Sequence, residues 1–271
     1  MAEKILYTNF PEKYNNFIFD LDGTIYRGES LIPHADEVIN HLKSIGKKIV
    51  FVSNKTTGTI KDYYHLLKNW GLNIEESEII NATLVAKNYL VKNFNGAKFF
   101  AVGEESFIKE IEESGLMFST NPKEIKILLI TLDRTLDYQK LETAAQALEN
   151  GARFFAANID DTCPVDNGEV LDAGSVISAL EKRTHRKLEL HFGKPSEFMF
   201  SEIKSRLDFN SGNTLLIGDR LETDIAMGNK FGVDTALVAT GVKNFINGSN
   251  GYSPTYQLNS VGDLIEGILN K

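Results

Sequence analysis

Two acidic residues stand two positions apart at the end of an apolar run. Asp20 and Asp22 follow the apolar residues 17–19 and precede Gly23 and Thr24. Residues two apart on an extended backbone point the same way, so we expect both carboxylates to face one site. Two such groups do not both stay ionised at close range without a cation. The pair therefore indicates a metal site or a division into nucleophile and acid, while a plain Asp-Gly turn stays open as an alternative.

A second acidic pair follows another apolar run late in the chain. Asp219 comes after residues 214–217 and Gly218, and Asp224 comes five positions later. Carboxylate oxygens, completed by waters and a substrate phosphate, form the environment that Mg²⁺ prefers. The pair thus predicts magnesium ligands, with a helix-capping role for Asp224 as the alternative.

Hydroxyl, amide and ammonium groups at two further places suit an anion. Ser53-Asn54-Lys55-Thr56 lies between an apolar run and a helix-like stretch, where a hydroxyl, backbone N–H groups and a helix N-terminus form a phosphate cradle. Lys194 stands between Gly193 and Pro195, just before another expected helix. The alternatives are a helix cap at Ser53 or within 56–59, and an ordinary solvated lysine at 194.

These side chains need a scaffold that brings strand ends together. Short apolar runs alternate with amphipathic stretches, which is typical of a doubly wound parallel sheet covered by helices, an α/β fold. In such sheets ligands bind beyond the carboxyl ends of the strands. The expected strands cover residues 17–19, 48–52, 214–217 and 236–238. The expected helices cover residues 35–44, 60–69, 196–207 and 223–231.

The middle of the chain carries more elements than one crossover needs. A βαβ unit takes about 30 residues, whereas residues 82–190 are enough for a domain. We expect a core in two parts, 1–81 and 191–271, with an inserted α/β domain at 82–190. Its expected helices cover residues 82–93, 107–114, 138–148 and 174–184, and its strands cover 98–103, 125–131 and 152–158. Residues 243–254, rich in Asn, Gly and Ser, are expected to form a surface loop.

Composition excludes several classes of function. The chain has 271 residues and a net charge of -8, which argues against a broad nucleic-acid surface. No apolar run approaches the length that crosses a bilayer, so we expect no membrane partner. The single cysteine, Cys163, forms no internal disulfide, and the N-terminus shows no secretory signal. A soluble protein in a reducing cytoplasm fits these features.

The four motifs, taken in order, resemble those of the haloacid dehalogenase-like (HAD) hydrolase superfamily, whose cores have a Rossmann-like fold. The matching residues are Asp20, Asp22, Gly23 and Thr24, then Ser53, then Lys194, then Asp219 and Asp224. A finer resemblance points to the NagD and 4-nitrophenylphosphatase-like subfamily, which inserts a cap between motifs two and three. It rests on residues 23–28, Ile32-Pro33, and the cap residues Asn158, Asp160, Pro164, Gly168 and Gly174-Ser175.

The resemblance implies a magnesium-dependent phosphatase that hydrolyses the phosphate monoester of a small metabolite. Asp20 would attack phosphorus and form an aspartyl-phosphate, and Asp22 would act as acid and then as base. Lys194 and Ser53 would bind phosphoryl oxygens, with Gly23, Thr24, Asn54 and Lys55 nearby. Mg²⁺ would be held by Asp20, the carbonyl of Asp22, Asp219 and Asp224.

The cap would recognise the leaving group, and Asn158 and Asp160 are its candidate contacts, against a purely hairpin-forming role. One departure is Ser53-Asn54-Lys55, where the subfamily usually reads Thr-Asn-Asn, and Lys55 adds a cation near the cradle. The leaving group stays open among sugar phosphates, nucleotides and other phosphorylated metabolites, and a homodimer formed through the cap stays open too.

Other classes fit the motifs less well. A module that uses an aspartyl-phosphate as a binding or switch signal, without turnover, is the main alternative, but it would be shorter and needs neither Asp22 nor a cap. A dehalogenase does not require the second acid. A phosphonatase would need a Schiff-base lysine in the cap, and no lysine stands out for that role. All motif residues are present, which argues against a pseudoenzyme.

Overall fold

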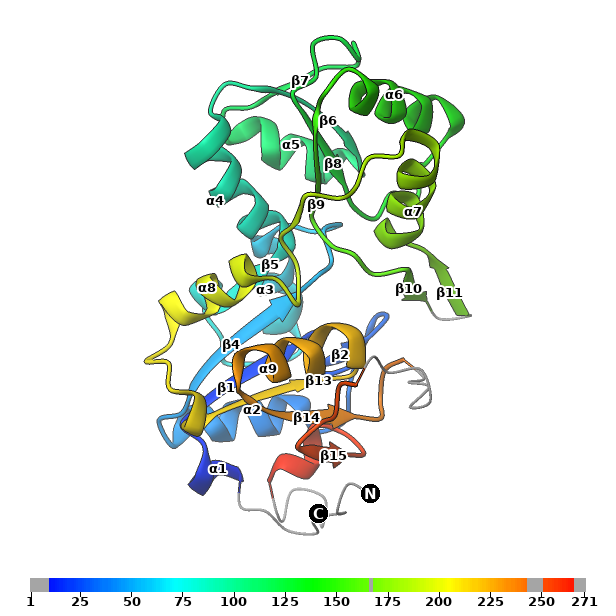
Figure 1. The fold of residues 1–271 in the computed structure, drawn as a ribbon. Helices are drawn as coiled ribbons and strands as arrows, with labels where there is room; N and C mark the ends of the chain where they lie inside the picture. The colour runs from blue at the N-terminus through cyan, green and yellow to red at the C-terminus, as the bar shows by residue number, and fades with distance from the viewer. Residues whose placement is uncertain (1–9, 166–167, 243–250, 266–271) are drawn as a thin grey trace. The chain divides into compact units, whose positions relative to one another are not determined.

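The computed structural model describes residues 10–165, 168–242 and 251–265 (Figure 1). The chain separates into two compact units. Unit 1 takes the described residues of 1–53, 60–80 and 200–271, and unit 2 takes those of 54–59 and 81–199. Residues 54–59, 81 and 191–199, which were predicted from the sequence to belong to the core, therefore group with unit 2.

Unit 1 is built on a six-stranded sheet with β1 inside it. In sheet order its strands are β15 (Tyr256–Leu258), β14 (Asp234–Val238), β13 (Thr214–Gly218), β1 (Asn16–Asp20), β4 (Lys48–Ser53) and β5 (Ile79–Asn81). The pairs from β15 to β4 are parallel. Asp20 is the register partner of Val52, and Phe19 is the partner of Ile217. The carboxyl ends of β1, β4 and β13 therefore meet at one edge, as the sequence predicted.

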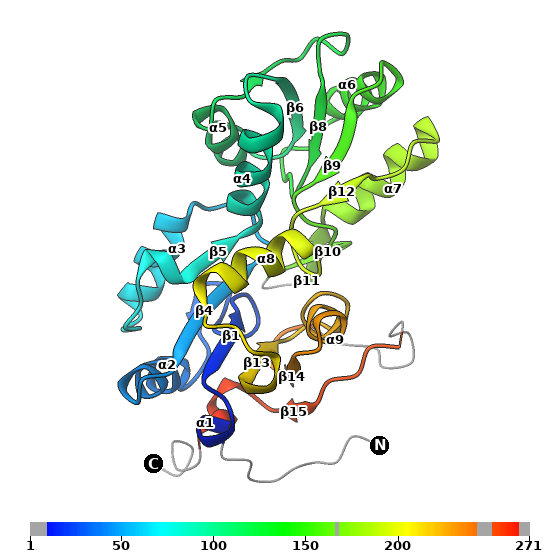
Figure 2. The same cartoon turned by 60° about the vertical axis from the view of Figure 1, so that its left-hand side comes forward.

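Both faces of this sheet are covered. Phe17 and Phe19 pack in one core cluster with Val38 and Leu42 of helix α2 (Ala35–Ser44). Ile18, which points to the other face of β1, is also fully buried. Figure 2 shows α2 and α9 (Ala226–Phe231) on opposite sides of these strands. Continuous apolar strands such as Phe17-Ile18-Phe19 fold this way because each face needs an apolar partner.

The remaining elements of unit 1 connect these strands. They are α1 (Phe10–Lys13), β2 (Tyr26–Arg27), β3 (Ser30–Leu31), α3 (Ile60–Asn69), η1 (Glu76–Glu78), α8 (Glu197–Arg206), η2 (Ser211–Asn213), η3 (Leu221–Ile225) and η5 (Val261–Leu264), with α8 beginning in unit 2. The helix expected over 223–231 begins instead with a π-helical turn, η3, and continues as α9. Of the expected loop, residues 243–250 lie outside the described residues, and 251–254 contain no helix or strand.

Unit 2 has its own parallel sheet of five strands. In sheet order they are β12 (Leu190–His191), β9 (Arg153–Ala156), β8 (Ile127–Ile130), β6 (Lys98–Val102) and β7 (Met117–Phe118). A separate antiparallel hairpin joins β10 (Thr162–Val165) to β11 (Gly168–Leu171). The helices are α4 (Ala82–Phe94), α5 (Glu105–Glu113), α6 (Tyr138–Glu149) and α7 (Ala173–Thr184).

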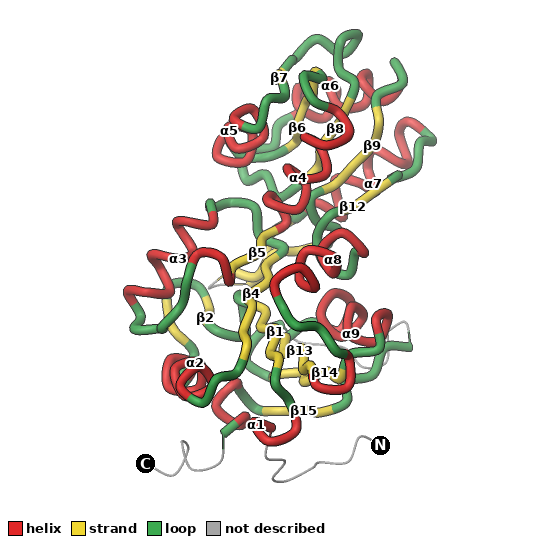
Figure 3. Tube along the Cα trace, turned by 90° about the vertical axis from the view of Figure 1, so that its left-hand side faces the viewer, coloured by secondary structure: helices red, strands yellow, loops and turns green. Residues whose placement is uncertain are grey.

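Helices cover both faces of this second sheet as well. Phe154 packs in one cluster with Leu148 of α6 and Leu180 of α7. The next residue along β9, Phe155, points the other way and contacts the ring of Tyr89 on α4. Figure 3 shows α5 and α7 on either side of the strands of this unit. The α/β architecture expected for residues 82–190 is therefore present.

No helix among the described residues combines the length and the apolar character needed to cross a membrane.

Candidate active site

Asp20 ends the strand β1, between β13 and β4 of unit 1. Its side chain is only 6% exposed, and Oδ2 accepts a hydrogen bond of 3.2 Å from Oγ1 of Thr24. Thr24 is fully buried and lies in the turn that follows the strand. This hydroxyl therefore orients the Asp20 carboxylate.

Three buried carboxylates meet at this edge of the sheet. One oxygen each from Asp20, Asp219 and Asp224 lies within 4.8 Å of the other two. Asp219 follows β13 directly, and Asp224 lies in the π-helical turn η3. All three are at most 6% exposed. Such a group repels itself unless a cation compensates its charge, and oxygen-only donors are what Mg²⁺ prefers. The donor set fits this ion.

Backbone N–H groups fix two of these carboxylates. The N–H of Val242 donates to Oδ2 of Asp219 over 2.8 Å, and the N–H of Arg220 donates to Oδ2 of Asp224 over 3.1 Å. Because Arg220 precedes the first turn of η3, Asp224 both joins the carboxylate group and receives an N–H at the start of this helix. The two roles that the sequence left open for Asp224 are compatible.

Glycines leave the space that these side chains fill. A β-carbon on Gly23, whose φ is +86°, would lie 2.6 Å from Oδ2 of Asp219. One on Gly241 would lie 1.8 Å from the same oxygen, and one on Gly218 would lie 2.2 Å from Cγ of Asp224. The loop 239–242 after β14 thus belongs to the site. The sequence predicted a strand over 236–238 that ends at this crevice, but no residue of the loop 239–242 was among the predicted site residues.

Asp22 lies outside this carboxylate group. The strand β1 ends at Asp20, so Asp22 belongs to the turn that follows the strand, and it is not one of the three clustered carboxylates. Its Oδ2 accepts a hydrogen bond of 2.9 Å from the hydroxyl of Tyr26, which is 1% exposed. Burial and then the negative charge of Asp22 raise the pKa of Tyr26 well above its ordinary value. Tyr26 is therefore a neutral donor that orients Asp22, a role that the sequence analysis did not assign.

Ser53 and the residues after it divide between the two units. Ser53 ends β4 and is 2% exposed. The helix α3 begins at Ile60, so Ser53 does not cap it. Lys55 is half-buried. Thr56 contacts Thr131 through a 2.5 Å bond between their hydroxyl oxygens, within unit 2.

Lys194 belongs to unit 2 and is only 2% exposed. This excludes the ordinary solvated lysine that the sequence left open. The backbone N–H of Lys194 donates to Oδ1 of Asn54 over 2.6 Å, and Nδ2 of Asn54 donates to the carbonyl of Lys194 over 3.2 Å. The structure thus brings together two predicted site residues that are 140 positions apart in the sequence.

The two predicted cap residues, Asn158 and Asp160, are connected to Asn54 by hydrogen bonds. Nδ2 of Asn54 also donates to Oδ2 of Asp160 over 2.8 Å. Asn158 is 2% exposed and donates to Asp160 and Asp172, and its Oδ1 accepts from Thr131. A role for Asn158 and Asp160 in leaving-group recognition stays a prediction, and their described contacts are to the protein itself.

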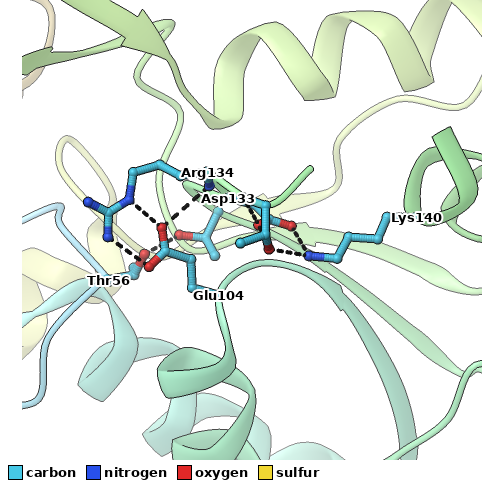
Figure 4. A network of polar contacts seen from close by, with 7 residues as sticks. Thr56, Glu104, Asp133, Arg134 and Lys140 are labelled. Carbon is cyan, nitrogen blue, oxygen red and sulfur yellow. Dashed lines mark hydrogen bonds and ion pairs between the residues drawn. The ribbon is translucent and has the colours of Figure 1, made fainter. Parts of the chain in front are cut away.

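Two charged pairs lie in the segments that follow the strands β6 and β8, and Figure 4 shows them together with Thr56. Glu104 forms two ion-pair contacts with Arg134, of 2.6 and 2.9 Å. Lys140 reaches Oδ2 of Asp133 over 2.7 Å, and the Asp133 side chain is fully buried. Hydrogen bonds from Arg134 are the main cause that lowers the pKa of Glu104. These pairs fix the segment 131–137 of unit 2.

Comparisons with known proteins identify the family. A sequence profile described as haloacid dehalogenase-like hydrolase matches residues 17–117, and a second profile for HAD-hydrolase-like domains matches residues 191–264. The chain belongs to the haloacid dehalogenase-like hydrolases. Both matches cover the segments that carry the acidic motifs.

Individual relatives place the chain within this family. The chain is 35% identical to the sugar-phosphatase AraL of Bacillus subtilis, over 96% of both chains. It is similar to the structure of a p-nitrophenyl phosphatase from Archaeoglobus fulgidus, with a TM-score of 0.85 and 31% identity, covering 93% of this chain and 98% of that one. A glycerol phosphate phosphatase from Mycobacterium tuberculosis, in complex with magnesium, gives a TM-score of 0.83 at 25% identity, covering 96% and 79%. The NagD and 4-nitrophenylphosphatase-like resemblance seen in the sequence is confirmed.

Proposed function

We propose that this HAD hydrolase is a magnesium-dependent phosphatase that hydrolyses small phosphate monoesters through an aspartyl-phosphate on Asp20. The chain is a phosphoric monoester hydrolase by its family and its relatives. The observation that carries the finer proposal is the group of three buried carboxylates at the strand ends of unit 1. Asp20, the member that ends β1, is the nucleophile.

The first half-reaction transfers the phosphoryl group. A carboxylate oxygen of Asp20 attacks phosphorus, the bond from phosphorus to the ester oxygen breaks, and the leaving oxygen takes a proton from Asp22. Thr24 and Tyr26 hold Asp20 and Asp22 in their orientations through the bonds described above. The products are the free alcohol and an acyl phosphate on Asp20.

The second half-reaction releases phosphate. Water attacks phosphorus, Asp22 takes a proton from this water, and the bond between phosphorus and the Asp20 oxygen breaks. Inorganic phosphate leaves, and both aspartates return to their starting states. The Ser53 hydroxyl and the Lys194 ammonium bind phosphoryl oxygens in both steps, with Gly23, Asn54 and Lys55 as further candidate contacts.

Asp20, Asp219 and Asp224 would hold Mg²⁺, together with the carbonyl of Asp22. A bound Mg²⁺ supplies positive charge that lets a carboxylate and a phosphate approach each other. The crystal structure of a relative in complex with magnesium supports this choice of ion.

The substrate is a small phosphorylated metabolite. Relatives named as sugar and glycerol phosphate phosphatases support a polyol or sugar phosphate. We assign leaving-group recognition to the inserted domain over residues 82–190, as the sequence analysis expects. We also place the protein in the cytoplasm, since Cys163 has no second cysteine with which to form an internal disulfide.

Phosphate release from 4-nitrophenyl phosphate and a panel of sugar, glycerol and nucleotide phosphates tests the proposal. The wild type, Asp20→Asn and the exposed control Asp208→Asn are compared with Mg²⁺ or EDTA. We expect metal-dependent turnover by the wild type and the control, and a loss of at least about 10³-fold in Asp20→Asn. Acid quenching during turnover should leave a base-labile phosphate on the peptide that contains Asp20.

Two results would contradict the proposal. Turnover that survives in Asp20→Asn would exclude Asp20 as the nucleophile. A folded wild type that acquires phosphate on Asp20 without turnover would favour the binding or switch role instead.

A further inference from the structure

The side chain of Asn54 binds both backbone polar groups of Lys194. Its Oδ1 accepts from the N–H over 2.6 Å, and its Nδ2 donates to the carbonyl over 3.2 Å. An amide side chain that meets one residue in this way acts like the edge of a neighbouring strand. It fixes the position and the rotation of the Lys194 backbone, and therefore the direction in which the lysine side chain leaves it.

The residue before the lysine is adapted to this contact. A β-carbon on Gly193 would lie 2.6 Å from Oδ1 of Asn54 and 2.8 Å from the carbonyl of Ala157. Any larger residue at 193 would push the amide of Asn54 away from Lys194. The glycine of the Gly193-Lys194-Pro195 motif is thus explained by the approach of Asn54.

The amide of Asn54 is itself held by a chain of hydrogen bonds. Its Nδ2 donates to Oδ2 of Asp160, and the same oxygen accepts from Asn158. Asn158 is tied to Asp172, the N-cap residue of α7, and to Thr131 after β8. Thr131 then bonds to Thr56, two residues beyond Asn54. This chain of hydrogen bonds begins and ends in the segment 54–59. The segment is therefore anchored to the rest of unit 2 at two points, Asn54 and Thr56.

We infer that Asn54 is a positioning residue for Lys194, and that Asp160 and Asn158 act through Asn54 instead of contacting the leaving group. The inference rests on the proposed function of Lys194 as a ligand of the phosphoryl oxygens. Asn54 keeps the backbone of Lys194 in place. The carboxylate of Asp160 keeps the amide of Asn54 in the orientation that presents Oδ1 to the Lys194 N–H. Their effect is on the phosphoryl group, which every substrate shares.

A swap of the two polar partners tests this geometry. Asn54→Asp keeps an acceptor for the Lys194 N–H but turns a second oxygen toward Asp160 and toward the Lys194 carbonyl. Two carboxylates are then in contact, and the segment shifts. Adding Asp160→Asn places an amide donor opposite the new carboxylate and restores one of the lost bonds. Asp160→Asn alone leaves an acceptor for Asn54, so it should be mild.

The measured quantities are kcat/KM over the substrate panel and the affinity for orthovanadate with Mg²⁺, measured by calorimetry. We expect Asn54→Asp to lower kcat/KM by about 30-fold, by the same factor within about threefold for every leaving group. Vanadate affinity should fall in parallel, and Asp160→Asn should restore most of both. Asn54→Ser, which removes the contacts without adding charge, should behave like Asn54→Asp but without rescue. The exposed control Asn73→Asp should leave both quantities unchanged.

The inference fails if the loss varies more than about tenfold between leaving groups, because that result indicates direct substrate contact. It also fails if Asp160→Asn does not rescue Asn54→Asp while circular dichroism shows both variants folded. A wild type without turnover would remove the proposed function, and the vanadate affinities of the same variants would still decide the role of Asn54.

Discussion

Gly241 lies directly against the carboxylate of Asp219. A β-carbon at 241 would stand 1.8 Å from Oδ2 and 2.3 Å from Cγ of that residue, well inside contact distance. The same carboxylate oxygen accepts the N–H of Val242. The loop after β14 therefore both holds Asp219 and leaves no room for a side chain beside it.

Gly241→Ala should displace Asp219 from the carboxylate group. We expect Mg²⁺-dependent turnover to fall about 100-fold, with a rise in the Mg²⁺ concentration needed for half-maximal activity. The overpacking should also cost about 1–3 kcal/mol of stability, measured by urea unfolding. Gly212→Ala is the matched control, since a β-carbon there meets only an ordinary contact at 3.5 Å. Full activity of Gly241→Ala at low Mg²⁺ would contradict this account of the loop.

Tyr26→Phe removes the hydroxyl that donates to Asp22 and keeps the ring in the core. A misaligned acid matters most where the leaving oxygen needs a proton. We therefore expect kcat to fall about tenfold for alkyl phosphates and less than about threefold for 4-nitrophenyl phosphate, whose leaving group needs little protonation. Steady-state kinetics on both substrates measure the contrast. Tyr64→Phe, at a partly buried residue that packs against the same core, should change neither rate. An equal loss on both substrates would show that Tyr26 supports the fold instead of the acid.

The two ion pairs of Figure 4 should differ in their contribution to stability. Lys140→Met leaves the Asp133 carboxylate, whose side chain is 0% exposed, without its cation. We expect the free energy of unfolding to fall by about 2–3 kcal/mol. Arg134→Met breaks a pair whose arginine side chain is 60% exposed, and should cost about 1 kcal/mol or less. Urea unfolding at neutral pH measures both, and equal losses would contradict the difference that burial predicts.

Asp234 gives unit 1 a pH-dependent stability. Burial raises its pKa, but hydrogen bonds from Tyr14 and Lys13 outweigh burial and leave the pKa below its ordinary value. A carboxyl group of this kind stabilises the fold above its unfolded pKa of about 3.9, and the stabilisation is lost as the pH falls through the folded pKa. Asp234→Asn should therefore cost about 1 kcal/mol at pH 7, since the side chain is about a third exposed.

Unfolding of Asp234→Asn and the wild type should converge as the pH falls below about 3. Asp208→Asn, at an exposed position, should have the same free energy of unfolding as the wild type at every pH, so there is no difference to converge. A stability loss in Asp234→Asn that persists unchanged in acid would show that the charge of the Asp234 carboxylate does not stabilise unit 1.

Much of the sheet and of the acidic site could be predicted from local sequence. Asp20 and Asp219 each follow an unbroken apolar run, and such runs fold into buried parallel strands whose ends share one edge. The contacts of Asn54 could not be predicted, because its partners Asp160 and Lys194 are 106 and 140 residues away and no local pattern marks them. The π-helical start of α9 was also missed, since apolar spacing does not distinguish it from an α-helical turn.

The contacts of Asn54 and Thr56 bear on how substrate preference can be exchanged between relatives. Unit 2 is not one continuous stretch of sequence, because the residues 54–59 belong to it as well as 81–199. A chimera that takes only the long insertion from a relative would pair its loops with a foreign segment at 54–59. We therefore expect a chimera to fold well only when the donor sequence supplies both the short segment and the long one.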